Sequence, residues 1–356
     1  MKRISNLASM LVGLLFSLNA HCDIGSNSDK GVHEIVFSDI REGWINTGII
    51  ADRDETIVFE AKGRLEAEGL SVPASFVIWY RVGNEGVAKN IAADRFSFVS
   101  EERGDLYVTA RPAHFYWQDD RGTYPPELKS LPATDTGLKL LIRPNASEII
   151  ASQKPPEGFH YLHVLGQSQV WSDAGTGDEY VIIGEPNDET GIIKADLDIP
   201  ITRDTVFSFE WNYERLPAAM AETAIPGHDY FSIALEFENG QDLTWMRSQF
   251  LEAGTHFRCP LPWWDERETH FVIEDANTEL GTWQRHERNV LDDYATAVPG
   301  ELPSKIVGIW FIGANLLAKL PGKASFRDAK ILQGDQEVAL LPAVISAAAI
   351  QRSHSH

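Results

Sequence analysis

The chain has 356 residues, of which 43% are hydrophobic and 23% charged, with 52 acidic residues against 31 basic ones. These fractions are typical of a globular protein and exclude general disorder, while the length allows two domains. The formal net charge of −21 repels phosphate backbones, and no basic stripe interrupts it, so we expect no nucleic-acid partner.

The N-terminus has the features of a secretory signal. Lys2 and Arg3 precede an apolar run over residues 7–18, and small and polar residues follow, which is the order of the regions in a signal peptide. The run is too short to span a bilayer as a helix. We therefore expect a signal peptide over residues 1–22, no membrane span, and an exported protein that is periplasmic or secreted. Its removal would leave Cys259 without a disulfide partner.

The first half of the chain predicts β-structure. Short apolar segments alternate with Gly, Asp and Asn, and no window repeats with the period of a helix. The segments that predict strands are residues 36–37, 56–61, 76–82, 96–99, 105–110 and 138–142. Residues 83–86, Gly-Asn-Glu-Gly, predict a turn because glycine and asparagine tolerate positive φ. We expect a β-sandwich or small barrel over residues 33–145.

The second half predicts a jelly roll. A linker over residues 144–158, with two adjacent prolines, precedes it. Its strand segments are residues 161–165, 180–183, 191–197, 206–211, 230–237, 243–245, 270–273, 306–312 and 324–332. This number and spacing favour a two-sheet jelly roll over residues 159–334, with one helical turn in residues 290–297 and a tail from residue 335 to 356. The predicted fold class is all-β, with two β-sandwich or jelly-roll domains joined by a short proline-containing linker.

A family resemblance lies in five segments of the first half. These are Trp44-Ile-Asn-Thr-Gly-Ile, Glu60-Ala-Lys-Gly, Val77-Ile-Trp-Tyr-Arg-Val-Gly-Asn-Glu-Gly, Gly104-Asp-Leu-Tyr-Val and Asp119-Asp-Arg-Gly-Thr-Tyr. Through them residues 44–143 resemble the calcium-dependent galactose-binding lectins of Gram-negative bacteria. The resemblance implies a calcium ion held by Asp119 and Thr123, which in turn grips sugar hydroxyls. Pro126 and Glu127 stand where that family has asparagines, and Glu127 can replace one ligand because calcium accepts carboxylate oxygens flexibly.

A second resemblance covers residues 190–332. Its segments are residues 211–217, Gly281-Thr-Trp283, Arg288-Asn-Val-Leu-Asp-Asp-Tyr294 and Asp328-Ala-Lys-Ile. They are similar to an uncharacterised jelly-roll domain of secreted bacterial proteins, and similar segments occur in carbohydrate-binding modules. The resemblance implies a concanavalin-like or galactose-binding-like sandwich and no known reaction.

Two aromatic clusters are candidates for sugar recognition, which needs flat aromatic faces with polar groups beside them. Tyr116 and Trp117 precede a glycine turn, and Trp263 and Trp264 lie in a proline-bounded segment that we expect to be a loop. We predict that these four side chains stack on a glycan. The alternative is that they are packing aromatics that cover the ends of the sandwiches.

Carboxylates of the second half suggest catalysis as another hypothesis. Strand periodicity places Glu236 and Glu238 on one face, where an acid and a nucleophile could cleave a glycosidic bond. Glu210 and Glu214 share a face in the same way, and for both pairs the alternative is a solvated outer face. For Glu210 and Glu214, the solvated face would lie on the side of the strand opposite Trp211.

Three further patterns suggest chemistry. Tyr294 with Arg288 and His286 could neutralise a uronate and abstract a proton, as a lyase requires, although Arg288 and Asp292 at helical spacing more simply form an ion pair. His160 and His163 could bind a metal, but strand spacing places them on opposite faces. The acidic, glycine-rich turn over residues 173–179 could hold calcium, although a tight hairpin is the simpler interpretation.

From these patterns we expect an exported protein that binds a poly- or oligosaccharide with assistance from calcium. The alternatives are a polysaccharide-degrading hydrolase or lyase, and an envelope assembly module that binds other proteins.

Overall fold

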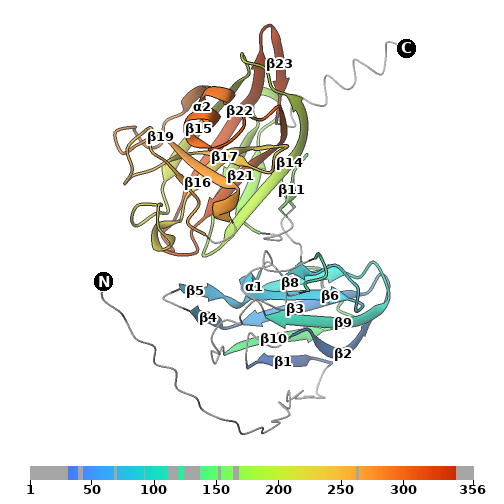
Figure 1. The fold of residues 1–356 in the computed structure, drawn as a ribbon. Helices are drawn as coiled ribbons and strands as arrows, with labels where there is room; N and C mark the ends of the chain where they lie inside the picture. The colour runs from blue at the N-terminus through green and yellow to red at the C-terminus, as the bar shows by residue number, and fades with distance from the viewer. Residues whose placement is uncertain are drawn as a thin grey trace, which may run out of the picture.

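The computed structural model describes residues 31–38, 43–67, 70–91, 93–110, 119–123, 137–150, 154–162, 168–261 and 264–341. In this part of the chain each half of the sequence forms a β-sandwich (Figure 1), which confirms the predicted all-β fold class. None of the helices described here is long and apolar enough to cross a membrane. The predicted signal peptide, residues 1–22, lies outside the described residues.

The N-terminal sandwich consists of two four-stranded antiparallel sheets. Its strands are β1 (His33–Phe37), β2 (Ile45–Ala51), β3 (Thr56–Lys62), β4 (Arg64–Ala67), β5 (Leu70–Pro73), β6 (Ile78–Val82), β7 (Lys89–Asn90), β8 (Arg95–Val99), β9 (Gly104–Ala110) and β10 (Leu138–Arg143). One sheet has the order β1-β10-β3-β8 and the other β2-β9-β6-β7, while β4 and β5 form a separate hairpin. The sheet edges at β8 and β7 border the site described below.

Alternation of apolar and polar residues explains these strands. In β10, Leu138, Leu140 and Ile142 are buried while Lys139 is exposed, as a strand with one covered face requires. The strand predicted over residues 76–82 begins instead with a helical turn, α1 (Ala74–Val77), which follows Pro73. The predicted turn over residues 83–86 is confirmed, because the N–H of Gly86 donates to the carbonyl of Gly83 at 3.3 Å.

The C-terminal sandwich has a seven-stranded and a six-stranded sheet. Its strands are β11 (His160–Tyr161), β12 (Trp171–Ala174), β13 (Val181–Gly184), β14 (Thr190–Pro200), β15 (Val206–Arg215), β16 (Phe231–Phe237), β17 (Asp242–Arg247), β18 (His256–Arg258), β19 (Glu268–Glu274), β20 (Gln284–Asn289), β21 (Lys305–Ala314), β22 (Lys323–Gln333) and β23 (Gln336–Ala339). Its helical elements are η2 (Gly177–Glu179), η3 (Ile225–Gly227), η4 (Trp264–Glu266) and α2 (Val290–Ala297). Every strand segment predicted from the sequence overlaps one of the observed strands, and the helical turn predicted over residues 290–297 is α2.

The larger sheet has the order β11-β14-β21-β16-β17-β19-β18 and the smaller one β12-β13-β22-β15-β20, with β23 paired to β22. Strands β17 and β19 run parallel. Aromatic side chains fill the space between the sheets, and Trp171, Trp211 and Trp245 are fully buried. The outer-face interpretation of β15 is confirmed, because Trp211 is buried while Glu214 is exposed. Strands β12 and β13 form the hairpin expected around residues 173–179.

The C-terminal sandwich extends beyond the predicted boundary at residue 334. Gly334, at φ 56°, lies in the turn that joins β22 to β23. Leu340 and Leu341 follow β23 and are only 2% and 5% exposed in the core of the sandwich. The predicted tail over residues 335–356 therefore contributes a strand and two core side chains, because the chain turns back along β22.

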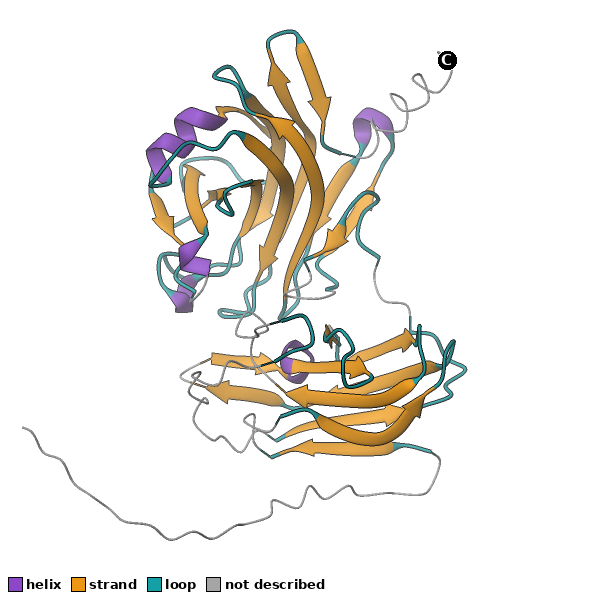
Figure 2. Cartoon of the chain, turned by 45° about the vertical axis from the view of Figure 1, so that its right-hand side comes forward, coloured by secondary structure: helices purple, strands orange, loops and turns teal. Residues whose placement is uncertain are grey.

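Among the described residues, an ion pair and an apolar contact join the two sandwiches, which lie one beside the other in Figure 2. Arg64 on β4 donates to both carboxylate oxygens of Asp188, at 2.6 and 3.3 Å. Leu316, in the loop after β21, is buried in the hydrophobic core of the N-terminal sandwich. An ion pair and an apolar contact thus accompany the covalent link.

Candidate functional site

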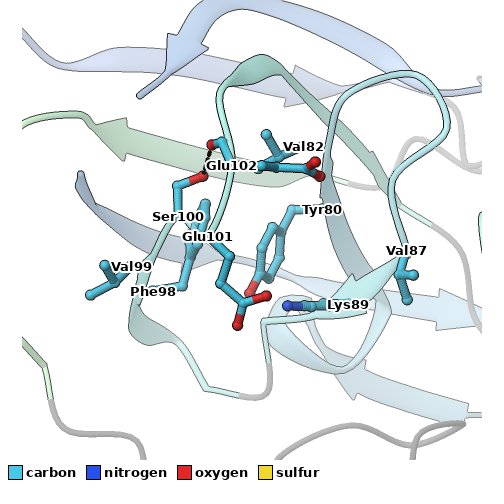
Figure 3. Close-up of a pocket in the computed structure, with 9 residues that line it drawn as sticks. All are labelled: Tyr80, Val82, Val87, Lys89, Phe98, Val99, Ser100, Glu101 and Glu102. Atoms are coloured by element: carbon cyan, nitrogen blue, oxygen red, sulfur yellow. Dashed lines mark hydrogen bonds between the residues drawn. The ribbon is translucent and has the colours of Figure 1, made fainter. Parts of the chain in front are cut away.

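A hollow of about 150 Å³ opens in the N-terminal sandwich, between strands of opposite sheets (Figure 3). The segments that line it are β6, the connection into β7, and the end of β8 with the turn that follows. The lining residues are Tyr80, Val82, Val87, Lys89, Phe98, Val99, Ser100, Glu101 and Glu102. We refer to this site as the hollow.

Two aromatic rings form the floor of the hollow. Tyr80 and Phe98 stack with their ring centroids 4.4 Å apart and an angle of 29° between the ring planes. Phe59, fully buried, lies behind them with its centroid 5.2 Å from Tyr80 and 5.5 Å from Phe98. Tyr80 is only 4% exposed and Phe98 is half-buried, so Phe98 provides the open part of the floor, and it is preformed because close-packed core side chains move little.

Charged side chains border the hollow. In Figure 3 the Lys89 ammonium and the Glu101 carboxylate point toward one another across the Tyr80 phenol. The side chain of Glu102 adds a second carboxylate to the border. The Ser100 hydroxyl donates to the backbone carbonyl of Glu102 at 2.7 Å, and this hydrogen bond stabilises the turn. Burial, together with the nearby Glu101 carboxylate, raises the pKa of Tyr80 well above its ordinary value. The phenol therefore remains a hydrogen-bond donor at neutral pH.

This arrangement suits a small ring that has an apolar face and polar edges. Aromatic rings pack against C–H groups, and ammonium and carboxylate groups bind hydroxyls. An engineered cavity of about 150 Å³ holds benzene, so the hollow has room for one six-membered ring. Its lining contains two carboxylates and one ammonium, which disfavours anionic ligands.

Of the four predicted stacking residues only Trp264 is among the described residues, and it does not line the hollow. Tyr116, Trp117 and Trp263 lie outside the described residues. Trp264 belongs to η4, is only 4% exposed and packs edge-on against Trp310, with ring centroids 6.1 Å apart. Trp264 presents no open ring face. Its position fits the alternative interpretation, in which it is a packing aromatic, because the loop that contains it lies against the larger sheet.

The predicted calcium ligands are described only in part, since Glu127 lies outside the described residues. Asp119 accepts hydrogen bonds from Nε and Nη2 of Arg121 at 3.1 and 2.8 Å, and from the Thr123 N–H at 3.1 Å. Burial acts to raise the pKa of Asp119, but the hydrogen bonds from Thr123 and Arg121 outweigh it and lower the pKa to about 2. The Arg121 guanidinium thus already binds the Asp119 carboxylate, which is the group that would coordinate calcium.

The two candidate catalytic carboxylates belong to separate networks. Glu236 is paired with Lys194 at 2.7 Å and Arg267 at 3.0 Å, and Trp310 Nε1 donates to it at 3.2 Å. Glu238 lies beyond the end of β16, where its Oε1 accepts from the N–H and hydroxyl of Ser304. The pairing of β16 with β21 shifts register after Glu236, so the alternation that predicted a shared face ends before Glu238. This geometry does not support an acid and nucleophile pair.

The residues of the lyase hypothesis also have separate partners. Tyr294 is buried, and Asn239 Nδ2 donates to its hydroxyl at 2.9 Å. His286 Nε2 lies 2.7 Å from a Glu274 carboxylate oxygen. Arg288 binds the carboxylate of Asp293 and not that of Asp292, because Asp293 is on the helix face turned toward the core.

The sequence did not single out Lys89, Phe98, Glu101 or Glu102. Their one local signal is the pair of acidic residues directly after the apolar segment Phe96-Ser-Phe98-Val. The hollow needs β6 and β8 to face each other from different sheets, which no single segment indicates.

Residues 175–329 match a protein family described as "Protein of unknown function (DUF3047)", a range that lies within the C-terminal sandwich and excludes the hollow. A comparison with curated protein sequences gives no match.

Three similar solved structures concern proteins that act on or bind carbohydrates. The xyloglucanase domain of NopAA, a type three effector from Sinorhizobium fredii in complex with cellobiose, is 6% identical, with 49% of this chain and 92% of that chain covered at a TM-score of 0.29. The family 11 carbohydrate-binding module of the cellulosomal cellulase Lic26A-Cel5E of Clostridium thermocellum is 15% identical, with 50% and 84% covered at 0.25. A structure on the promiscuous specificity of carbohydrate-binding modules of the β-sandwich superfamily is 10% identical, with 80% and 94% covered at 0.23. TM-scores this low are insufficient to infer a shared function.

Proposed function

We propose that the protein is an exported glycan-binding protein and that the hollow holds one sugar ring. The observation that carries the proposal is the stacked Tyr80 and Phe98 floor bordered by Lys89 and Glu101. A pyranose would lay its C–H face on the half-buried Phe98 ring, because Tyr80 is only 4% exposed, and would direct its hydroxyls to the charged border. Export rests on the signal-like sequence of residues 1–22.

The charges of the hollow favour a neutral or amino sugar. Glu101 and Glu102 accept hydrogen bonds from hydroxyl or ammonium groups and repel carboxylates and sulfates, while Lys89 donates to a ring or hydroxyl oxygen. Uronate-containing and sulfated glycans should therefore bind more weakly than neutral ones. The net charge of −21 adds to this selectivity at low ionic strength.

Calcium has no role in sugar binding at the hollow under this proposal. Binding should persist in a chelator, because Lys89 and the backbone-anchored turn at Ser100 supply the polar groups. The calcium site at Asp119, Thr123 and Glu127 remains a separate prediction, as does the lectin resemblance from which it comes.

The test is a titration of the full chain with neutral sugars, amino sugars and uronates, by calorimetry or NMR. A hexose of about twelve heavy atoms at about 0.3 kcal/mol per atom gives a Kd on the order of 1 mM. Lys89→Ala and Glu101→Gln should each weaken binding about tenfold, which corresponds to one lost hydrogen bond to a charged group. Lys139→Ala, at an exposed ion pair with Glu34, is the matched control.

Undiminished affinity in both hollow variants would place the sugar elsewhere on the chain. Stronger binding of uronates than of neutral sugars would contradict the charge argument. An absence of binding to every sugar tested, at concentrations well above 1 mM, would overturn the proposed function.

A further inference from the structure

A buried polar cluster lies on the outer side of the seven-stranded sheet, under the loops that precede β16 and follow β18. His228 follows η3, Cys259 follows β18, and His270 is in the middle of β19. Their exposed fractions are 3%, 1% and 0%. One potential ligand atom from each lies within 4.8 Å of the other two. Two imidazoles and a thiol thus converge beneath these loops, on the face of the sheet opposite the main core.

The tautomer of His228 is fixed by its backbone partner. Its Nδ1 lies 2.8 Å from the carbonyl oxygen of Glu222, and a carbonyl only accepts, so Nδ1 carries the hydrogen. Nε2 lies 3.3 Å from Cys259 Sγ. Metal-binding histidines commonly donate their other ring N–H to a carbonyl in this way. In tetrahedral zinc sites the sulfur and nitrogen ligands are about 3.6 Å apart, close to the spacing found here.

His270 provides an independent observation. It is fully buried, and neither ring nitrogen has a hydrogen-bond partner among the described residues. The Phe257 ring stacks on it at 4.9 Å, and the Tyr230 ring packs edge-on at 4.8 Å. A buried polar nitrogen without a partner costs free energy. This free-energy cost is removed for a nitrogen whose lone pair coordinates a cation.

Glu268 stands beside His270. Its Oε1 lies 3.5 Å from His270 Nε2 and accepts from the Tyr230 hydroxyl at 3.2 Å. The carboxylate is 3% exposed. A thiolate and a carboxylate together balance the charge of a divalent cation, which a buried site requires.

We propose that His228, Cys259 and His270, with Glu268 as the fourth ligand, bind a thiophilic divalent transition-metal ion of the zinc class. The ion sits between the two imidazole nitrogens and Sγ, and the thiol proton leaves to solvent as the metal–sulfur bond forms. A closed site with four protein ligands is structural in character, and it fastens the two loops to β19.

The test is metal binding by the full chain carrying Cys22→Ser, His354→Gln and His356→Gln, so that Cys259 is the single thiol and the terminal histidines do not compete. After dialysis against a chelator, zinc(II) is titrated in competition with a chromophoric chelator. We expect one ion per chain with a Kd below about 1 µM, and cobalt(II) should give a thiolate charge-transfer band. His270→Gln and Cys259→Ser should weaken binding at least a hundredfold. His256→Gln, an exposed histidine on β18, is the matched control and should bind as the parent does.

The cobalt spectrum of the parent chain keeps the test decisive if a variant fails to fold, because it reports on Cys259 without a substitution in the site. Zinc should also raise the melting temperature of the parent, since it binds the folded state. Binding without a thiolate band, or zinc affinity unchanged in folded His270→Gln, would overturn the proposal. So would the absence of stoichiometric binding at tenfold excess of zinc.

Discussion

Arg288 holds the carboxylate of Asp293 with two hydrogen bonds, 2.7 Å from Nε to Oδ2 and 2.6 Å from Nη2 to Oδ1. The same Oδ2 accepts from Trp245 Nε1 at 2.7 Å. The three side chains come from β20, α2 and β17, so Asp293 fastens the helix to strands of both sheets. Asp293 is only 6% exposed, which makes its charge costly to leave without partners.

Asp293→Ala should destabilise the C-terminal sandwich by about 3 kcal/mol, because the half-buried Arg288 guanidinium and the buried Trp245 indole lose their acceptor. At about 2–4 °C per kcal/mol for a sandwich of this size, the melting temperature should fall by roughly 10 °C. Asp292→Ala is the matched control. Asp292 is exposed in the same helical turn, and its loss should cost less than about 1 kcal/mol. Equal shifts in the two variants would contradict the role assigned to Asp293.

Glu238 should contribute pH-dependent stability. Burial acts to raise its pKa, but hydrogen bonds from Ser304 and Lys305 outweigh it and hold the pKa below the ordinary value. A carboxyl with a lowered folded-state pKa stabilises the fold above its unfolded-state pKa, and this contribution is lost as the pH falls through the folded-state pKa. Because Glu238 is exposed and solvent screens its charge, Glu238→Gln should cost less than about 1 kcal/mol at pH 7 and nothing in strong acid. Denaturant unfolding at several pH values measures the difference.

Glu236→Gln is the companion variant, because it leaves Lys194 and Arg267 without their shared carboxylate. We expect a loss of about 3 kcal/mol at pH 7, since all three side chains are mostly buried. If either glutamine variant instead kept its stability and abolished turnover of a polysaccharide, the hydrolase hypothesis would be restored.

Calcium binding at Asp119 should compete with Arg121. In Arg121→Ala the carboxylate loses its guanidinium partner and becomes free to bind a cation. Millimolar calcium should therefore raise the melting temperature of Arg121→Ala more than that of the parent. Arg103→Ala removes a comparable exposed ion pair, with Asp52, and serves as the control. A larger calcium effect in the parent would show that Arg121 does not compete for the site.

Trp264 should affect stability and not sugar binding. Trp264→Ala leaves a cavity against Trp310 and should cost about 3–5 kcal/mol. Trp283→Ala, which removes a half-buried ring 4.0 Å from the Arg327 guanidinium, should cost only about 1 kcal/mol. Calorimetry with the sugar that binds best provides the second readout. Loss of sugar binding in folded Trp264→Ala would restore its predicted stacking role.

Much of the fold could be predicted because apolar alternation produces most strands. In β10 the buried side chains recur at every second position, and in β15 the buried aromatic side chains do. Strand β20, Gln284–Asn289, could not be found in this way, since all six of its residues are polar. It is a strand because β15 pairs with it, and His286 reaches inward to a buried carboxylate, Glu274.

The sites were harder to predict for a related reason. His228, Cys259 and His270 have spacings that match no metal motif, and they meet only because the loops before β16 and after β18 cover the same face of one sheet. The sequence indicated Cys259 only as a cysteine without a disulfide partner. The hollow likewise depends on the juxtaposition of β6 and β8 across two sheets.

The Arg64 and Asp188 pair has a hydrodynamic consequence. Each side chain is about one third exposed, at 33% and 31%, so salt reaches the contact that orients one sandwich against the other. At 1 M ionic strength the Debye length is about 3 Å, and of the two contacts named among the described residues the apolar one at Leu316 then remains. We expect the halves to tumble as one body in dilute buffer and more independently in concentrated salt, with shorter rotational correlation times by NMR. Unchanged correlation times would mean that the apolar contact alone sets the angle between the halves.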